Sequence, residues 1–353
     1  KGLKTFVNEP KGDQPMVSGG PFMLTKFVKD DLAMFKPNPN WYGAKPRIDG
    51  WGLQTFKNKD ALVTALKANE IDAVGGVPVT ALSALKSAGI TIDEGEGLAM
   101  RDLIINSNPD KPTHRELLKA DVRKAMEMAI DRKAIVETAW LGKATEGSTI
   151  IAPATASDGQ KWHNDAIKPL PFDTAQANAL LDQAGYAKGP DGVRVADGHK
   201  MIYEVIFADD ESGEGDRAFQ IIQSGFKEVG IALSQKKVDS SAAWDAVYCD
   251  DNCQYRDFDL AMWDWFPSAD PDFMLAAMTC ASWGDWNDTG YCSKEFDALQ
   301  AQQKDSIDPA ARKKIIDQMQ QMVYDARPYI ILTYDTRLDA WSPKWDGFIP
   351  SSQ

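Results

Sequence analysis

The sequence is poor in the residues that nucleophilic and phosphate-binding sites require. It has three histidines in 353 residues, no Gly-x-Ser-x-Gly elbow, and no cysteine placed beside a histidine in a pattern typical of a triad. It also lacks a glycine-rich phosphate loop. Pairs of carboxylates do not indicate a catalytic site here, because such pairs are expected by chance among 52 Asp and Glu residues. We therefore predict a protein without catalytic residues or a cofactor, and keep an extracellular hydrolase as the alternative from another class.

Long apolar runs and an excess of positive charge are also missing. No stretch reaches the roughly 20 apolar residues that a membrane span needs, and Lys1 does not begin a signal peptide. With 39 basic and 52 acidic residues, the formal charge is −13. This balance disfavours nucleic acid, which proteins bind through basic patches, and anionic lipid surfaces. The opening without Met indicates a processed protein or a piece of a longer one.

Only four cysteines occur, in two close pairs. Cys249 lies near Cys253, and Cys280 lies near Cys292. Four cysteines allow three pairings, of which local pairing is the simplest. Two disulfides would place the protein outside the cytosol.

A metal site has little support in the spacing. The segment from Cys249 to Cys253 lacks the two-residue spacing of zinc sites, and the histidines lie far away in sequence. The three histidines are His114, His163 and His199. We therefore predict no metal.

Apolar spacing and capping residues predict alternating strands and helices. Expected strands cover 22–28, 32–35, 51–56, 71–74, 100–106, 201–207, 231–238, 258–265 and 329–334. Expected helices cover 59–69, 79–87, 115–130, 132–140, 174–184, 215–229, 241–248, 272–278, 293–305 and 309–326. This order predicts an α/β fold with mixed sheets. The long irregular stretch 142–171 is of a length that is often functional.

A change in composition between residues 90 and 110 predicts a domain boundary. We expect residues 1–100 to form part of lobe I, 101–330 to form lobe II, and 331–353 to return to lobe I. Two strands that cross between α/β lobes would make a hinge, and hinged lobes close on ligands.

The segment 258–275 carries the strongest indication of binding. Strand alternation places Trp263 and Trp265 on one face and Asp264 on the other. Ser268 and Asp270 follow in a proline-containing turn. Aromatic faces beside carboxylates suit a cleft that holds an organic solute. The same pattern fits a buried strand followed by an ordinary Asp-Pro turn.

Together these segments resemble the large solute-binding proteins of bacterial ABC importers, a class that includes oligopeptide-, dipeptide- and nickel-binding proteins. The most specific match is an Asp-Val-Arg-x-Ala segment that ends Ala-Ile-Asp-Arg. The matching segments are 19–22, 38–42, 66–72, 121–132, 180–186 and 258–272.

The resemblance implies a two-lobed, periplasmic-binding-protein-like (type II) fold whose first lobe is incomplete, because the family's long N-terminal stretch is absent here. It implies an extracytoplasmic receptor, either periplasmic or a cell-surface lipoprotein, anchored through a segment absent here. Such a receptor captures a small-molecule or peptide solute and delivers it to an ABC permease. We expect a monomer.

The resemblance also suggests site residues. In peptide-binding members an Asp three residues after the strand-ending Trp holds the peptide's α-amino group, and Ser268 occupies that position here. We expect Trp265 to stack on the solute and Asp264 and Asp270 to anchor it. Arg101 and Asp102 would line the cleft. A small peptide is the expected solute, with an oligosaccharide or another non-peptide solute as the alternative.

Overall fold

The computed structural model describes residues 18–208, 213–248, 256–283 and 285–348. The chain divides into two compact units, Lys1–Glu70 and Ile71–Gln353, which are described separately. No helix within the described ranges is long and apolar enough to cross a bilayer.

The smaller unit contains a three-stranded antiparallel sheet and one helix. The strands pair in the order β1 (Phe22–Val28), β2 (Leu32–Pro37) and β3 (Trp51–Gln54), and α1 covers Lys59–Lys67. The side chain of Asn58 caps α1 by accepting a hydrogen bond from the backbone N–H of Ala61 at 2.8 Å. The predicted strands and the predicted cap are therefore confirmed.

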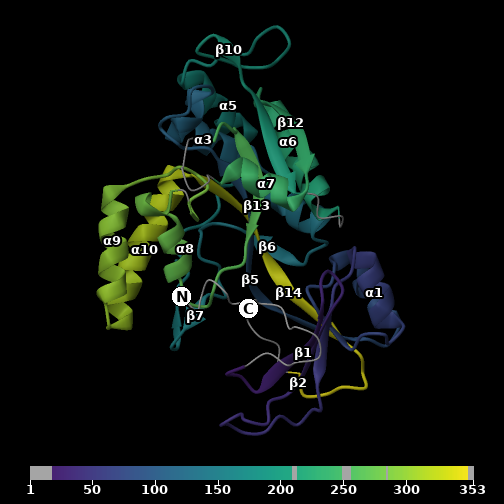
Figure 1. The fold of residues 1–353 in the computed structure, drawn as a ribbon. Coiled ribbons are helices and arrows are strands. Elements are labelled where there is room, and N and C mark those ends of the chain that lie inside the picture. The colour runs from purple at the N-terminus through teal and green to yellow at the C-terminus, as the bar shows by residue number, and fades with distance from the viewer. Residues whose placement is uncertain (1–17, 209–212, 249–255, 284, 349–353) are drawn as a thin grey trace. The chain divides into compact units, whose positions relative to one another are not determined.

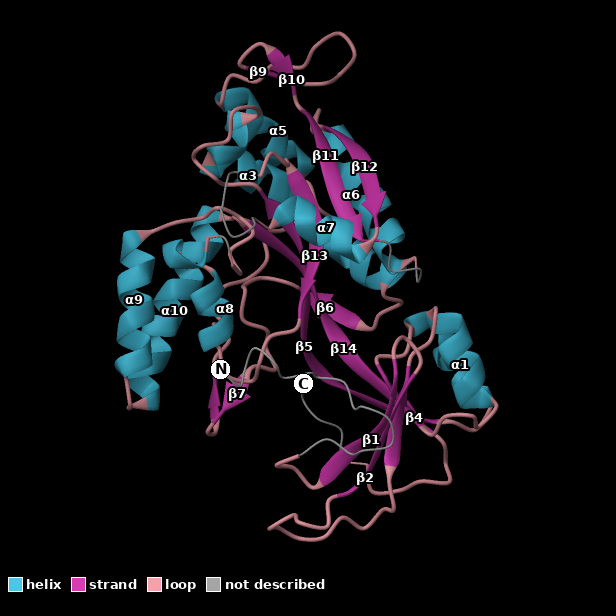
Figure 2. Cartoon of the chain, viewed as in Figure 1, coloured by secondary structure: helices cyan, strands magenta, loops and turns pink. Residues whose placement is uncertain are grey.

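A seven-stranded mixed sheet runs through the larger unit (Figure 2). Strand β11 pairs in parallel with β12 and β13, whereas β5 pairs antiparallel with β13 and β14. Strands β4 and β6 also pair antiparallel with β14. The strands are β4 (Ala73–Gly75), β5 (Thr91–Ile105), β6 (Ala144–Glu146), β11 (Ile202–Ala208), β12 (Ala232–Val238), β13 (Leu260–Trp265) and β14 (Tyr329–Trp341).

Helices cover both faces of this sheet, and α9 and α10 lie side by side (Figure 1). Short turns and two small hairpins complete the unit. The helices are η2 (Val79–Ala81), α2 (Leu82–Ser87), η3 (Arg115–Leu118), α3 (Ala120–Met128), α4 (Arg132–Ala134), η4 (Ile135–Ala139), α5 (Thr174–Gln183), α6 (Glu214–Glu228), α7 (Ser240–Val247), α8 (Asp272–Ala277), η5 (Cys280–Ser282), α9 (Lys294–Asp305) and α10 (Pro309–Ala326). The hairpins pair β7 (Ala156–Ser157) with β8 (Gln160–Lys161), and β9 (Val195–Ala196) with β10 (His199–Lys200).

Strand alternation separates two hydrophobic cores, one on each face of the sheet. Leu103 and Ile105 of β5 pack into a core with α3, α5 and α6. Met100 and Ile104 of the same strand pack into the other core, with α7, α8, α9 and α10. Because β5 is central and buried on both faces, neighbouring residues on it serve different cores.

The predicted boundary region is one continuous strand. The sequence predicts a strand only from residue 100, but β5 begins at Thr91 and includes Gly95 and Gly97. A Cβ at Gly97 would collide with the carbonyl oxygen of Asp335, so glycine lets β14 pass close by. The predicted lobe boundaries at 100 and 330 fall inside β5 and β14, and they remain predictions.

Candidate functional site

The predicted alternation along β13 is confirmed. Trp263 and Trp265 belong to the core that contains α7 and α8, whereas Met262 packs against the opposite core. Asp264 therefore lies on the other face from the two tryptophans. There it sits directly opposite Arg101 in the register between β13 and β5.

Three charged side chains meet on that face. Arg101 donates from Nη1 to Oδ2 of Asp264 at 2.6 Å and from Nε to Oδ2 of Asp335 at 2.9 Å. Burial raises the pKa of Asp335, and the nearby Arg101 guanidinium partly offsets that rise. Asp264 keeps 33% of its side chain exposed. We call Arg101, Asp264 and Asp335 the charged trio.

An exposed aromatic ring accompanies the charged trio. Phe266 follows β13 and is 71% exposed, and the Arg101 guanidinium carbon lies 5.9 Å from its ring centroid. A cation held near a phenyl face is a weakly favourable contact. The trio and Phe266 thus present charge and an apolar surface together.

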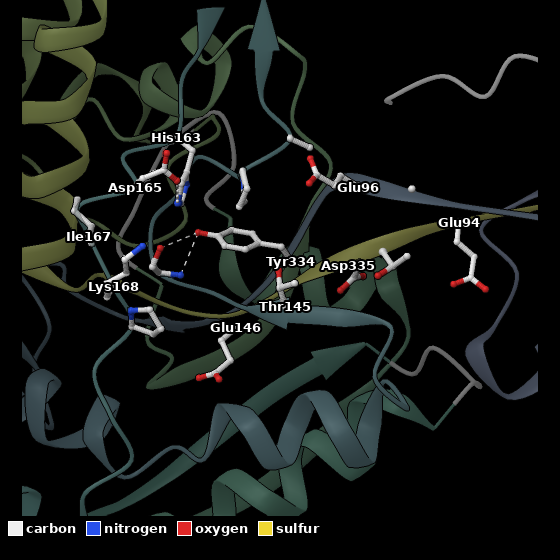
Figure 3. A pocket seen from close by; sticks show the side chains of 17 residues that line it. Glu94, Glu96, Thr145, Glu146, His163, Asp165, Ile167, Lys168, Tyr334 and Asp335 are labelled. Atoms are coloured by element: carbon white, nitrogen blue, oxygen red, sulfur yellow. Dashed lines mark hydrogen bonds and ion pairs between the residues drawn. The ribbon is translucent and has the colours of Figure 1, made fainter.

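Asp335 also lines a pocket of about 660 Å³ in the larger unit (Figure 3). The pocket is formed by β5, β6, β14 and parts of the stretch 142–171, which the sequence marks as a long irregular loop. Its side chains include five carboxylates and one lysine. They are Glu94, Glu96, Glu146, Asp165, Asp335 and Lys168.

The pocket remains acidic after its internal pairings are considered. Glu94 contacts Lys143 at 2.5 Å and Lys86 at 3.1 Å, and its pKa is lowered, chiefly by the hydrogen bond from Lys143. Burial lowers the pKa of His163, which also lines the pocket, so this imidazole is neutral near pH 7. Carboxylates therefore dominate the electrostatics of the lining.

A buried tyrosine supports the wall of this pocket. The Tyr334 hydroxyl donates to the carbonyl of Thr149 at 2.7 Å and accepts from the backbone N–H of the same residue at 2.8 Å. Figure 3 shows Tyr334 between His163 and Asp335. These bonds join β14 to the loop after β6 and hold the lining in place.

The two predicted tryptophans lie in an aromatic cluster. Trp265 is only 4% exposed, and its ring lies 5.9 Å from that of Phe273. Trp263 is half-buried, 6.0 Å from Trp244 and 6.2 Å from Tyr248. The burial of Trp265 fits a core residue, and its stacking role stays a prediction.

Asp102 is fully buried on the tryptophan face of β5. Neither carboxylate oxygen has a hydrogen-bond partner among the described residues. Burial raises its pKa well above the ordinary value, and the charge of Asp288 adds to that rise. Burial also raises the pKa of Asp288 to about 7, although the Tyr329 hydroxyl donates to it. Asp102 is thus placed as a buried, protonated acid.

The two remaining predicted residues differ in their contacts with the rest of the protein. Ser268 is exposed. Asp270 accepts two hydrogen bonds from Arg312, at 2.7 and 2.8 Å, and the bonds from Arg312 lower its pKa. It also accepts from the backbone N–H of Asp272 at the start of α8. Its carboxylate thus fixes α8 to α10.

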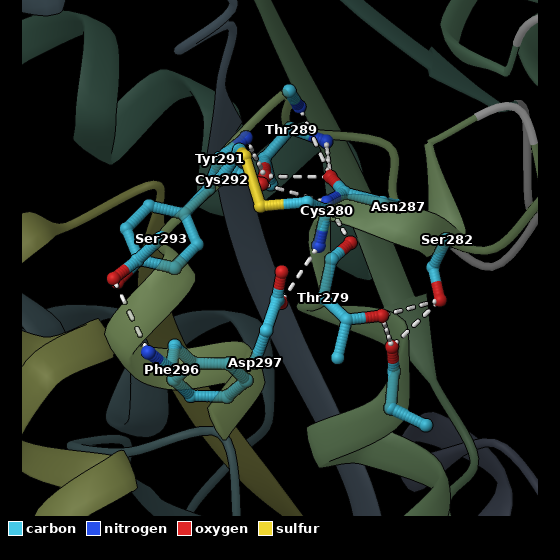
Figure 4. Close-up of a disulfide and its surroundings, with 12 residues drawn as sticks. Thr279, Cys280, Ser282, Asn287, Thr289, Tyr291, Cys292, Ser293, Phe296 and Asp297 are labelled. Atoms are coloured by element: carbon cyan, nitrogen blue, oxygen red, sulfur yellow. Dashed lines mark hydrogen bonds between the residues drawn. A yellow bond between two sulfur atoms is a disulfide. The ribbon is translucent and has the colours of Figure 1, made fainter. Parts of the chain in front are cut away.

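The predicted disulfide between Cys280 and Cys292 is confirmed (Figure 4). The loop that it closes is also held by Asn287, whose Nδ2 donates to the carbonyls of Thr279 and Tyr291. The predicted Cys249–Cys253 pair lies outside the described residues.

Sequence reasoning missed Asp335 and the pocket carboxylates. In the sequence, Asp335 is one acidic residue among 52, at the end of the expected strand 329–334. One feature of the sequence pointed to this pocket: the stretch 142–171, which is predicted to be functional, supplies part of its lining. It gave no indication that β14 supplies another part.

Comparison with known proteins identifies the family. Residues 4–286 match the sequence profile of bacterial extracellular solute-binding proteins, family 5 Middle. Protein XP55 of Streptomyces lividans is 25% identical over 345 residues, which cover 97% of this chain and 59% of that protein. The chain spans about three fifths of the length of the curated relatives that it matches first.

Two solved structures share the fold. The oligopeptide-binding protein AppA from Bacillus subtilis, in complex with a nonapeptide, aligns with a TM-score of 0.78 at 21% identity, covering 94% of this chain and 64% of that one. NikZ from Campylobacter jejuni, in complex with Ni(L-His), aligns with a TM-score of 0.78 at 22% identity, covering 93% and 63%. The predicted mixed α/β, periplasmic-binding-protein-like fold is confirmed. The chain belongs to the bacterial extracellular solute-binding proteins of family 5.

Proposed function

We propose that this chain is part of an extracytoplasmic receptor that captures a small peptide or similar oligomer and delivers it to an ABC import permease without chemistry. Membership of a solute-binding family supports the receptor role. The nonapeptide complex of a protein with this fold supports a peptide. Monomeric state and membrane anchoring through a segment outside this chain belong to the same proposal.

The observation that carries the peptide assignment is the acidity of the pocket. Glu94 is paired with Lys86 and Lys143, and Asp335 is paired with Arg101. The other charged lining residues are Glu96, Glu146, Asp165 and Lys168, a balance that still favours a positively charged group on the solute. A peptide supplies such a group at its α-amino end. An uncharged oligosaccharide could donate hydrogen bonds to these carboxylates but would gain no charge attraction from them.

Asp264 is the residue that we assign to the α-amino group. Ser268, at the position that the family resemblance points to, is neutral and cannot form the ion pair with an ammonium group that a carboxylate forms. Asp270 is committed to Arg312. Arg312 engages both oxygens of Asp270, whereas Arg101 contacts Asp264 through one oxygen, Oδ2, and fixes its orientation. Asp264 does not itself line the pocket, but it shares Arg101 with Asp335, which does. Phe266 would cover the first side chain of the peptide.

The experiment compares peptides with free and acetylated amino termini. Short peptides recovered from the purified protein by native mass spectrometry are resynthesised in both forms and titrated calorimetrically. We expect acetylation and Asp264→Asn each to weaken binding about 10- to 100-fold, because a hydrogen bond to a charged group contributes about 1.5–3 kcal/mol. Acetylation and Asp264→Asn combined should lower the affinity little more than either change alone.

Asp305→Asn, an exposed change at the end of α9, is the matched control and should bind as the wild type does. Equal affinity for free and acetylated peptides would reject the role of Asp264. Recovery of a single non-peptide solute would reject the peptide assignment.

A further inference from the structure

We propose that His114, Glu116 and His199 form a binding site for a divalent transition-metal ion, with Zn²⁺ as the best match. His114 and Glu116 are two positions apart, and His199, 83 positions after Glu116, joins them where η3 meets the β9–β10 hairpin. Each offers one ligand atom, and these atoms all lie within 4.8 Å of one another. None of the three lines the acidic pocket.

The spacing fits the geometry of a small cation. Oε1 of Glu116 lies 3.3 Å from Nδ1 of His114 and 3.2 Å from Nε2 of His199. Tetrahedral zinc with bonds of about 2.0–2.1 Å separates its ligand atoms by about 3.3–3.4 Å. Two of the three edges therefore already match. The third edge closes by rotation of the His199 side chain, which is 38% exposed.

The Glu116 carboxylate is held in an orientation that suits a cation. Glu116 is fully buried, and its Oε1 lies 3.2 Å from Nε2 of His199. The Tyr203 hydroxyl donates to the same oxygen at 2.8 Å and fixes the orientation of the carboxylate. Glu116 is thus a buried carboxyl group held in one orientation.

A further carboxylate lies near the first histidine, beyond hydrogen-bond distance. With Nδ1 of His114 directed at Glu116, its Nε2 faces Oδ2 of Asp259 at 4.0 Å. Lys111 donates to Oδ1 of Asp259 at 2.9 Å and holds that carboxylate in place. Histidines that bind zinc commonly direct their other ring nitrogen at a carboxylate, which sets the tautomer and raises the basicity of the ligand nitrogen.

The site is reachable from solvent through the histidines, whereas Glu116 closes the inner side. His199 sits on the hairpin, directly after the two-residue turn Asp197-Gly198, in which both residues have positive φ. A metal ion there would tie this hairpin to the segment that leads into α3. Three protein ligands leave the fourth position to water, as in an open zinc site.

The test uses the untagged full chain, freed of metal with a chelator and titrated with ZnSO₄. We expect one equivalent of zinc to remain bound after gel filtration, measured by elemental mass spectrometry. His114→Ala, His199→Ala and Glu116→Gln should each weaken binding at least tenfold. His163→Ala is the matched control, because this histidine binds the carbonyl of Ile151 outside the cluster, and it should retain zinc.

Circular dichroism establishes that each variant is folded, and His199→Ala, on an exposed hairpin, is the variant least able to disturb the fold. X-ray absorption at the zinc edge should report two imidazoles and oxygen ligands. The proposal is overturned if the wild type retains no stoichiometric zinc. It is also overturned if His163→Ala loses as much affinity as His199→Ala.

Discussion

At the scale of single residues, the two buried carboxyl groups Asp102 and Asp288 are the least expected feature. Both are fully buried beside Tyr329 in the core that contains Trp265. A charge at such depth is costly, so the folded state favours the protonated form. These residues couple the stability of the fold to pH.

Asp288→Asn tests that coupling. The folded pKa of Asp288 is about 7, above the ordinary 3.8, so between pH 4 and 7 the folded state binds a proton that the unfolded state has lost. The contribution of Asp288 to stability is complete below pH 4 and is lost as pH rises through 7. Relative to the wild type, Asp288→Asn should therefore gain about 4 kcal/mol over this window.

Urea unfolding at pH 4, 5.5, 7 and 8 measures this difference. Asp305→Asn, at an exposed position, should follow the wild type at every pH. A constant difference between Asp288→Asn and the wild type across the range would show that Asp288 does not titrate within it.

The sequence identified candidate site residues, but it did not show which side chains contact each other. The sequence analysis named Arg101 and Asp264, which the register of β13 and β5 places opposite each other. It could not find Asp335, because the ion pair with Arg101 joins residues 234 positions apart. Two irregularities in the β5–β14 register also shift which residues face each other, and no local pattern reveals them.

At the scale of elements, the loop between η5 and α9 depends on a covalent link. The Cys280–Cys292 bond joins residues 12 apart, and hydrogen bonds from Asn287 hold the chain between them. Closing a loop of this length stabilises a fold by about 3 kcal/mol, mainly by restricting the unfolded chain.

Replacing both cysteines, Cys280→Ser with Cys292→Ser, should lower the free energy of unfolding by about 3 kcal/mol. Guanidinium unfolding of the variant and the oxidised wild type measures the loss. Because neither Cys280 nor Cys292 lines the pocket, solute affinity should stay within twofold. An unchanged unfolding midpoint would show that hydrogen bonds alone hold the loop.

Helices were easier to predict than the long strands. Capping side chains mark where helices begin, as with Asp131, which lies just before the helix expected from residue 132 and accepts from the backbone N–H of Ala134. The helix expected over 132–140 is instead a short α-turn followed by a π-turn, Ile135–Ala139. The first half of β5 escaped prediction because its acidic and glycine residues resemble a loop.

At the scale of the whole molecule, the formal charge of −13 and the acidic pocket act in the same direction. Both attract a cationic solute, and mobile ions screen that attraction over about 10 Å at 0.1 M salt.

Raising NaCl from 0.05 to 0.5 M should therefore weaken binding of a lysine-rich peptide several-fold, with a smaller effect on a peptide without charged side chains. Calorimetric titration of both peptides at each salt concentration gives, for each peptide, the slope of log Kd against log salt concentration. Equal slopes would place the attraction outside the pocket and in the general surface charge.

The mixed α/β class follows from the order of strands and helices, and the family follows from short motifs spread along the chain. The pocket does not follow from either, because its walls come from β5, β6, β14 and an irregular loop. Such a surface exists only once distant segments have paired.

That pairing has a consequence for how the protein is made. Strand β5 sits at the centre of the main sheet, yet its neighbour β14 is synthesised more than 200 residues later. Contacts between such distant segments form slowly, because closing the long intervening loop costs entropy before any contact repays it. A nascent chain must therefore hold the β14 side of β5 uncovered until residues 329–341 emerge. Until then the exposed edge is available to chaperones and to aggregation alike.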